Sequence, residues 1–131
     1  MRQWAIRCFI CFILAVAGLA GTAQAKEQQP YTDEAFKAAQ DSGNTILIEI
    51  HADWCPTCKT QLPILDRLGR LPAYSEIERL RVDFDAQKSV VRRFKANSQS
   101  TLVLFKGKAE LARSVGETDE GRIRAMLGKA R

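Results

Sequence analysis

One segment of the chain, residues 46–59, joins an apolar run to a closely spaced pair of cysteines. It reads Ile46-Leu47-Ile48-Glu49-Ile50-His51-Ala52-Asp53-Trp54-Cys55-Pro56-Thr57-Cys58-Lys59. Residues 46–51 are mostly apolar on both faces of an extended chain, which is typical of a central strand covered on both sides. We therefore predict a buried strand that leads through a turn into a helix, with the two cysteines at the start of that helix.

Two thiols three positions apart at a helix N-terminus are suited to disulfide chemistry. The helix end offers unpaired N–H groups and a partial positive charge, and both favour a thiolate. Because the thiolate is the reactive form of cysteine, Cys55 is the predicted nucleophile. Cys58 is near enough in sequence to resolve the mixed disulfide that an attack by Cys55 creates.

Around these cysteines the chain resembles the thioredoxin family. The shared features are Glu49 within the apolar strand, the Ala52-Asp53-Trp54 lead-in, Lys59, Pro63, the run Thr101–Gly107 and the pair Val115-Gly116. The resemblance extends over residues 31–131. It implies a single α/β domain with a thioredoxin fold, in which helices flank a mixed central sheet.

Periodicity and turn signals predict the elements in the order α-β-α-β-α-β-β-α. The expected helices are 32–41, 56–68 with a bend near Pro63, 86–95 capped by Asp85, and a last one capped by Thr118. The expected strands are 46–51, 77–84, 102–105 and 111–115, with a hairpin turn at 106–108. Residues 26–30 are expected to be a short polar lead.

The first 25 residues have the layout of a secretory signal peptide. Two arginines form a positive start, residues 8–21 are an uncharged apolar run, and Ala23-Gln24-Ala25 is a small-x-small cleavage signal. The apolar run is short for a membrane span, which needs about 20 residues. We therefore predict a cleaved leader over 1–25, a thioredoxin-like domain over 26–131, and a periplasmic or secreted location. An uncleaved leader acting as a membrane anchor is the alternative.

Removal of the leader changes the charge and the cysteine count. The whole chain has 20 Lys and Arg against 15 Asp and Glu; without the leader's two arginines it has 18 against 15, a net charge of +3. This mild charge, with no basic block, gives no case for nucleic-acid binding. Cys8 and Cys11 lie in the leader, so the mature chain keeps only Cys55 and Cys58. A lone vicinal pair is too local to staple a fold, which favours a functional role.

Glu49 is an acid within an otherwise apolar strand. By resemblance it occupies the place of the family's buried aspartate, which relays a proton to and from the second cysteine. A buried carboxyl group suits such general acid–base work. The alternative is an ion pair with Arg79 or Lys59 for structural reasons.

The residues around the thiols are predicted to meet the substrate. Pro56 and Thr57 lie between the cysteines and tune their reduction potential. Strongly oxidising members of the family often carry a His there, so the resemblance favours a moderate or reducing potential. Trp54 is predicted to cover the active-site turn and contact partners. His51, the only histidine, stands where the family commonly has an aromatic residue, and a packed ring is as good an interpretation as a titrating one.

Ser100 is the main departure from the family pattern. Thioredoxins have a cis-proline immediately before the position of Thr101, facing the cysteines across the site. A cis bond before a non-proline residue costs about 2.5–4 kcal/mol, so we expect the bond before Ser100 to be trans. By resemblance, the proline shapes the backbone that binds substrate and discourages metal capture. Ser100 and Thr101 are therefore predicted substrate-binding residues, and the loss of proline leaves room for a specialised partner or a metal.

These observations predict an exported thiol–disulfide oxidoreductase that uses Cys55, Cys58 and Glu49. Its partners would be protein thiols and disulfides and a redox protein that recycles the cysteines; the resemblance implies no organic cofactor, and a monomer is expected. Zinc sites usually need four ligands, and the mature chain has two cysteines and one histidine, so no metal ligand is assigned. Two alternatives stay open: a metal-binding or metal-delivery module using the two cysteines with His51, and an interaction domain whose disulfide is only structural.

Overall fold

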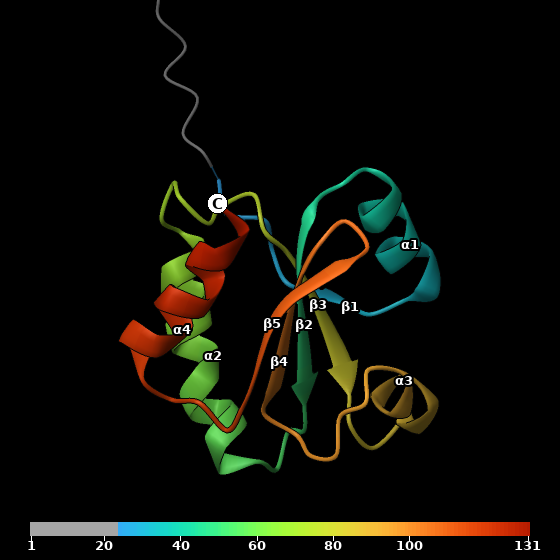
Figure 1. The fold of residues 1–131 in the computed structure, drawn as a ribbon. Helices are drawn as coiled ribbons and strands as arrows, with labels where there is room; N and C mark the ends of the chain where they lie inside the picture. The colour runs from blue at the N-terminus through green and yellow to red at the C-terminus, as the bar shows by residue number, and fades with distance from the viewer. Residues whose placement is uncertain (1–23) are drawn as a thin grey trace, which may run out of the picture.

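The computed structural model describes residues 24–131, which build a five-stranded sheet with two helices against each face (Figure 1). The predicted leader falls almost entirely on residues 1–23, outside the described residues, and it stays a prediction. Within residues 24–131, no helix has both the length and the apolar character needed to cross a membrane.

The sheet is mixed, as predicted. Its strands are β1 Gln29–Pro30, β2 Thr45–His51, β3 Glu78–Asp83, β4 Thr101–Lys106 and β5 Ala109–Val115. The helices are α1 Asp33–Asp41, α2 Pro56–Gly69, α3 Lys88–Arg93 and α4 Glu120–Leu127, followed by a 3-10 turn, Gly128–Ala130. The strand order is β1-β3-β2-β4-β5. The first three are parallel to one another, and β4 and β5 are antiparallel to their neighbours.

The central strand β2 is buried on both faces. Ile46, Ile48 and Ile50 pack in one apolar cluster with α1 and α3, and Leu47 packs in the other with α2 and α4. Side chains alternate along a strand, so Glu49 lies on the same face as Leu47, toward α2. Burying one such aliphatic side chain contributes about 1.5–3 kcal/mol. This apolar anchoring fixes the end of β2 at His51, from which the cysteine-bearing turn leads into α2.

The first strand was not predicted from the sequence. Residues 26–30 contain β1, which pairs with β3 in the register Gln29↔Leu80. Pro30 is tolerated there because β1 is an edge strand, where one side needs no N–H donor. A two-residue strand interrupted by proline leaves no alternation that a sequence pattern would reveal.

The third helix is shorter than the expected 86–95 and is not capped by Asp85. The carboxylate of Asp83 accepts the backbone N–H groups of Asp85 and Ala86, both at 2.8 Å. These two bonds hold residues 85 and 86 in a turn, so the helix begins only at Lys88.

The last helix is capped by Asp119 rather than by the expected Thr118. Its Oδ1 accepts the backbone N–H of Arg122 at 2.8 Å, and the helix begins at Glu120. Asp and Thr are both good N-cap residues, and the side chain that reaches the third residue of the helix decides between them.

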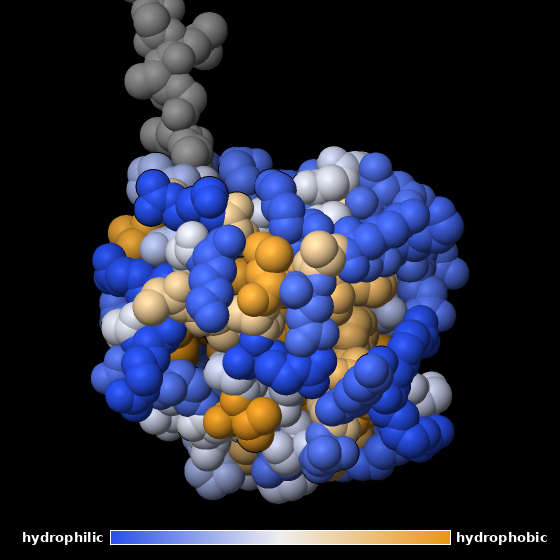
Figure 2. Space-filling view, viewed as in Figure 1, coloured by the Kyte–Doolittle hydropathy of each residue, from blue (hydrophilic) through white to orange (hydrophobic). Residues whose placement is uncertain are grey.

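Apolar side chains are scattered rather than continuous on the face that carries β5 and α4, which is mainly hydrophilic (Figure 2). Among the described residues, the large hydrophobic side chains that are well exposed are Trp54 and Val115. Trp54 directly precedes Cys55, and Val115 pairs with Thr101 in the sheet. Both therefore lie at the end of the sheet from which the cysteine turn emerges.

Candidate active site

Cys55 and Cys58 lie at the start of α2, as predicted. Cys55 is the N-cap residue, and its Sγ accepts the backbone N–H of Cys58 at 3.2 Å. Pro56 follows at the first helical position, where its missing N–H costs nothing. Both cysteines are free thiols and both are buried. The pair is therefore placed at the positive end of a helix and shielded from bulk water.

The pKa values of the two thiols are shifted in opposite directions. Burial works against ionisation of Cys55, but hydrogen bonds from the Cys58 thiol, the Ser100 hydroxyl and backbone N–H groups outweigh it and lower the pKa of Cys55. For Cys58, burial and then the hydrogen bond to Cys55 raise the pKa, more than the Ser100 hydroxyl lowers it. Cys55 is therefore the thiol that ionises first.

Ser100 faces the cysteines across the site. Its Oγ lies 3.1 Å from Cys55 Sγ and 3.1 Å from Cys58 Sγ. Its backbone has a φ of 60°, in the left-handed region that non-glycine residues seldom occupy. The serine that replaces the family's proline thus brings a hydroxyl group between the two sulfurs.

Backbone hydrogen bonds hold Ser100 in this conformation. Its N–H donates to the carbonyl of Ile50 at 2.8 Å, and its carbonyl accepts the N–H of Gly116 at 3.0 Å. The buried Gln61 amide also donates to that carbonyl, at 3.2 Å, and to the carbonyl of Glu117 at 2.8 Å. Gln61 was not predicted from the sequence; its place on α2, three residues after Cys58, is the signal that would have pointed to it.

Glu49 is buried in an ion pair with Arg79. Arg79 Nε donates to Glu49 Oε1 at 2.6 Å, and Gln28 Nε2 donates to Oε2 at 2.7 Å. Arg79 also reaches Asp66 on α2, with 2.7 Å between Nη1 and Oδ1. Burial lowers the pKa of Arg79, but the two carboxylates more than offset this and leave it above its ordinary value. Of the two ion-pair partners that the sequence suggested for Glu49, Arg79 is therefore the one present, and it compensates the charge of Glu49.

Glu49 and Cys58 line the same small cavity. The cavity has a volume of about 10 Å³, and its lining includes Glu49, Cys58, Gln61 and Leu62. A space of this size is at the lower limit for one water molecule. The residues Glu49 and Cys58 are therefore linked by a small space beneath α2.

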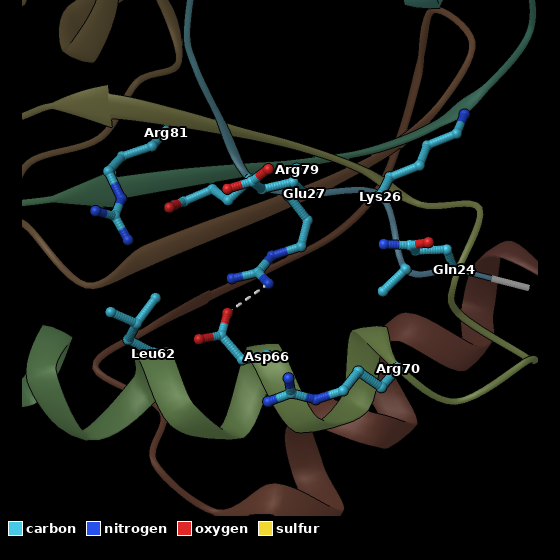
Figure 3. Close-up of a pocket in the computed structure, with 10 residues that line it drawn as sticks. Gln24, Lys26, Glu27, Leu62, Asp66, Arg70, Arg79 and Arg81 are labelled. Atoms are coloured by element: carbon cyan, nitrogen blue, oxygen red, sulfur yellow. Dashed lines mark hydrogen bonds and ion pairs between the residues drawn. The ribbon is translucent and has the colours of Figure 1, made fainter.

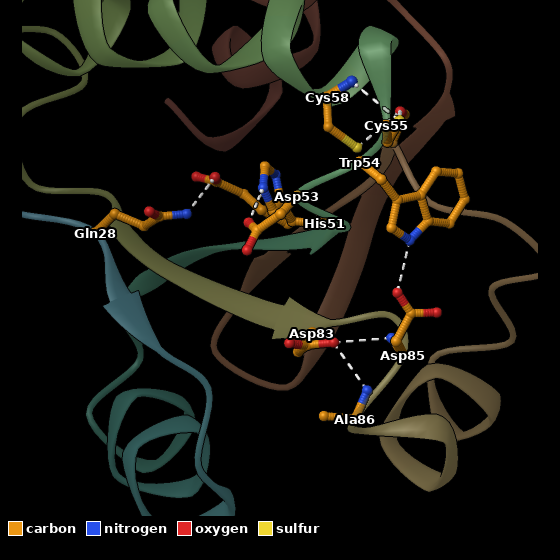
Figure 4. A network of polar contacts seen from close by, with 11 residues as sticks. Gln28, His51, Asp53, Trp54, Cys55, Cys58, Asp83, Asp85 and Ala86 are labelled. Carbon is orange, nitrogen blue, oxygen red and sulfur yellow. Dashed lines mark hydrogen bonds and ion pairs between the residues drawn. The ribbon is translucent and has the colours of Figure 1, made fainter.

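Trp54 lies at the exposed edge of the site, with 58% of its surface accessible. Its indole N–H donates to Asp85 Oδ2 at 2.7 Å, which fixes the ring beside the cysteine turn (Figure 4). His51 Nε2 lies 3.2 Å from Asp53 Oδ1 in the same turn. The indole thus presents an apolar surface next to Cys55 while its polar atom is satisfied.

The other predicted site residues differ in their access to a substrate. Pro56 is exposed and Thr57 is partly exposed, both between the cysteines. Thr101 is 1% exposed, and its hydroxyl donates to the carbonyl of Ser98 at 2.8 Å. The Thr101 side chain therefore supports the loop that carries Ser100 and is not presented to solvent.

A larger pocket lies away from the thiols, between α2 and the segment that leads into β1. Its volume is about 480 Å³, and its lining includes Lys26, Asp66, Arg70, Arg79 and Arg81 (Figure 3). The ion pair of Arg79 and Asp66 crosses it. The pocket contains neither cysteine nor histidine, so thiol chemistry has no place in it.

A metal centre has no additional support from the side chains. In the part of the chain that the structure describes, no three His, Cys, Asp or Glu side chains are grouped as metal ligands. The Cys55–Cys58 pair, at a helix start and beside the Ser100 hydroxyl, is a dithiol arranged for disulfide exchange. Together with the mixed sheet and its four helices, this defines a thiol–disulfide oxidoreductase with the thioredoxin fold.

Comparison with known proteins agrees with this class. The family model "Thioredoxin" matches residues 27–129. The chain is 33% identical to thioredoxin of Chlamydia trachomatis over 102 residues, covering 77% of this chain and 96% of that protein. It is 34% identical to thioredoxin of Chlamydia muridarum over 84 residues, covering 64% and 80%. The solved structure of Trxlp from Edwardsiella tarda is 40% identical, with a TM-score of 0.75, and the match covers 77% of this chain and 98% of that one. The chain belongs to the thioredoxin family.

Proposed function

We propose that this protein is an exported oxidoreductase that exchanges disulfides with protein substrates through Cys55 and Cys58. The observation that carries the proposal is the placement of Cys55 Sγ at the start of α2, where it accepts the backbone N–H of Cys58 at 3.2 Å and lies 3.1 Å from the Ser100 hydroxyl. These contacts lower the pKa of Cys55, whereas burial raises that of Cys58. An attacking thiol must be ionised, and a resolving thiol must hold its proton until the mixed disulfide has formed. The N-cap position of Cys55 supports the first role.

The reaction runs in two balanced steps. The Cys55 thiolate attacks one sulfur of a substrate disulfide; the mixed disulfide forms, and the second substrate sulfur leaves as a thiolate. Cys58 then loses its proton and attacks Cys55 Sγ, which closes the Cys55–Cys58 disulfide and releases the first substrate sulfur. Two electrons pass from the protein to the substrate. A dithiol redox partner reverses these steps on the protein, and the same pair can run in the oxidising direction.

We assign Glu49 as the base that takes the proton from Cys58 in the second step. Glu49 and Cys58 line the same small cavity, and the ion pair with Arg79 fixes the carboxylate there. General acid–base catalysis contributes typically 10²–10⁴-fold, so Glu49→Gln should slow release of the mixed disulfide by roughly 10²-fold while attack by Cys55 is unchanged. Asp66→Asn is the matched control, since it also removes a carboxylate from Arg79 but does not line the cavity. Equal slowing in both variants would assign the effect to Arg79 instead.

Trp54, Pro56 and Thr57 are proposed to contact the substrate beside the attacking sulfur. The exposed Val115 also lies near the site, because its neighbour Gly116 is hydrogen-bonded to Ser100, whose hydroxyl contacts both thiols. Two exposed apolar groups close to a reactive pair suit a protein segment rather than a small polar disulfide. We propose a monomer as the working form.

Export rests on the leader-like residues 1–25 and their cleavage signal. The test is to express the full chain in its host, fractionate the cells and determine the mass of the purified protein. A chain that begins at Lys26 and is found outside the cytoplasm supports export. A full-length chain in the cytoplasm refutes it, and a full-length chain in the membrane supports the anchor alternative.

The activity is tested by turnover. The purified domain 26–131, which contains the whole described core, is given a disulfide-bonded model protein and a small dithiol as electron donor. We expect reduction of the model protein that is lost in Cys55→Ser. Turnover by Cys55→Ser at the wild-type rate would contradict the proposal, and stoichiometric soft-metal binding without turnover would favour the metal-module alternative.

A further inference from the structure

The hydroxyl of Ser100 is placed symmetrically between the two reacting atoms. Its Oγ is 3.1 Å from each sulfur, and Ser100 itself is 3% exposed. A serine hydroxyl has one proton to donate and two lone pairs that accept. It can therefore donate to only one sulfur at a time, and a protonated thiol on the other side can donate to it.

The position of this hydroxyl is imposed by the surrounding backbone. Hydrogen bonds with Ile50, Gly116 and Gln61 hold Ser100 at a φ of 60°, a conformation that serine does not favour by itself. Proline is excluded from this backbone, because its ring fixes φ near −65°. Local strain at a reacting centre that its surroundings maintain is typical of a functional position.

We propose that Ser100 is a catalytic residue whose hydroxyl donates its hydrogen bond to whichever cysteine sulfur carries the negative charge. The proposal rests on the redox roles given above to Cys55 and Cys58. Before attack, the hydroxyl donates to the Cys55 thiolate, alongside the hydrogen bond that the Cys58 thiol donates to the same sulfur. Once Cys55 Sγ is bonded in the mixed disulfide, the hydroxyl turns to the sulfur of Cys58 as that thiol loses its proton. No bond to Ser100 forms or breaks, and its proton stays on Oγ.

This role has a consequence for the redox equilibrium. Hydrogen bonds to charged acceptors are stronger than those to neutral ones. The reduced pair carries a thiolate that the hydroxyl stabilises, whereas the closed disulfide carries no charge. Ser100 should therefore favour the reduced form and make the pair a stronger oxidant than it would be without the hydroxyl.

The experiment compares wild type with Ser100→Ala and Ser100→Gly. Both variants remove the hydroxyl; glycine also relieves the backbone at positive φ and alanine does not, so an effect shared by the two belongs to the hydroxyl. Ser114→Ala is the matched control, because the Ser114 hydroxyl makes no hydrogen bond among the described residues. Thermal unfolding of each reduced variant confirms that it is folded.

Two quantities are measured on each protein. The first is the pH at which alkylation of Cys55 reaches half its maximal rate, because this midpoint reports ionisation of the thiol, whereas access of the reagent to the sulfur changes the maximal rate. The second is the equilibrium constant for oxidation of the pair by glutathione disulfide. In both Ser100 variants we expect the acid dissociation constant of Cys55 to fall about tenfold. The equilibrium constant should rise about tenfold, which is about 30 mV toward a more reducing potential.

The result that would overturn the proposal is the absence of an effect in both Ser100 variants. If both Ser100 variants match Ser114→Ala and wild type within about twofold in both measurements, the hydroxyl is a packing group and the proposal is wrong. Neither measurement uses a protein substrate. A wild type that titrates as described but fails in the turnover assay would refute the proposed substrate class and leave the role of the hydroxyl intact.

Discussion

The carboxylate of Glu49 is bound inside the fold by the guanidinium of Arg79, with 2.6 Å between Oε1 and Nε. The two side chains are 6% and 7% exposed, so water screens neither charge. Arg79 donates a further hydrogen bond to Asp66, and Glu49 accepts one from Gln28. The acid that the sequence places within an apolar strand is thus stabilised by a network that joins β2, β3, α2 and the segment before β1.

Removal of Arg79 should destabilise the protein strongly. Breaking a buried ion pair by removing one partner costs about 3–5 kcal/mol, because the other charge stays buried without compensation. We expect a loss of this size in the free energy of unfolding of Arg79→Ala, measured by denaturant titration. Arg67→Ala is the matched control, since Arg67 pairs with Glu120 at the surface and such pairs contribute about 0–1 kcal/mol. Equal losses in the two variants would mean that the buried pair has no special weight.

Trp54 should matter for protein substrates and not for small ones. Truncation of an aromatic anchor at an interface costs about 2 kcal/mol, so Trp54→Ala should lower kcat/KM for a protein disulfide by about thirtyfold. Turnover of glutathione disulfide should stay within about twofold of wild type. Trp54→Phe keeps an apolar ring but loses the hydrogen bond to Asp85. This variant therefore separates the effect of apolar contact area on kcat/KM from the effect of that hydrogen bond. A loss toward glutathione disulfide as large as that toward protein would show that Trp54 acts on the cysteines themselves.

Glu117 should make stability depend on pH in the acid range. Its carboxylate accepts hydrogen bonds from Arg122 and from the backbone N–H groups of Asp119 and Thr118, which lower its pKa to about 2 from an ordinary 4.5. Because the pKa is lower in the folded state, this stabilisation is complete above pH 4.5 and is lost as the pH falls toward 2.

Thermal unfolding midpoints across that pH range provide the test. Glu117→Gln should flatten the dependence between pH 4.5 and 2 relative to wild type. Glu34→Gln is the control, since Glu34 is exposed and makes no ion pair or hydrogen bond within residues 24–131. A profile of Glu117→Gln that follows wild type throughout would contradict the assignment.

The long apolar patterns predicted most of the fold, whereas the polar cap signals predicted the start of α1, where Thr32 Oγ1 accepts the backbone N–H of Ala35, but not the starts of α3 and α4. The strand over residues 46–51, the helix after Cys55 and the hairpin near Gly107 each have a strong periodic or turn signal, and all three are present. The ends of α3 and α4 depend on which of several neighbouring polar side chains reaches a backbone N–H. That choice is made by tertiary geometry, which one sequence does not contain.

The candidate site was predicted in part. The spacing of the cysteines places both thiols at one helix end, and this was visible in the sequence. The contacts of Ser100 join residues that are 42 and 45 positions apart, and they depend on a positive φ that serine seldom adopts. The expectation that the loss of proline opens the thiols to a metal did not anticipate a hydroxyl that contacts both sulfurs.

In the proposed mechanism, Cys55 attacks the substrate disulfide and Cys58 resolves the mixed disulfide. Its most direct test is the mass of the covalent product formed when Cys58→Ser is incubated with a disulfide-bonded model protein. Without the resolving thiol, we expect a stable one-to-one mixed disulfide, mapped by peptide mass to Cys55 and absent from the Cys55→Ala, Cys58→Ser double variant. Capture of the same product by the double variant, or no covalent product at all with Cys58→Ser, would contradict it.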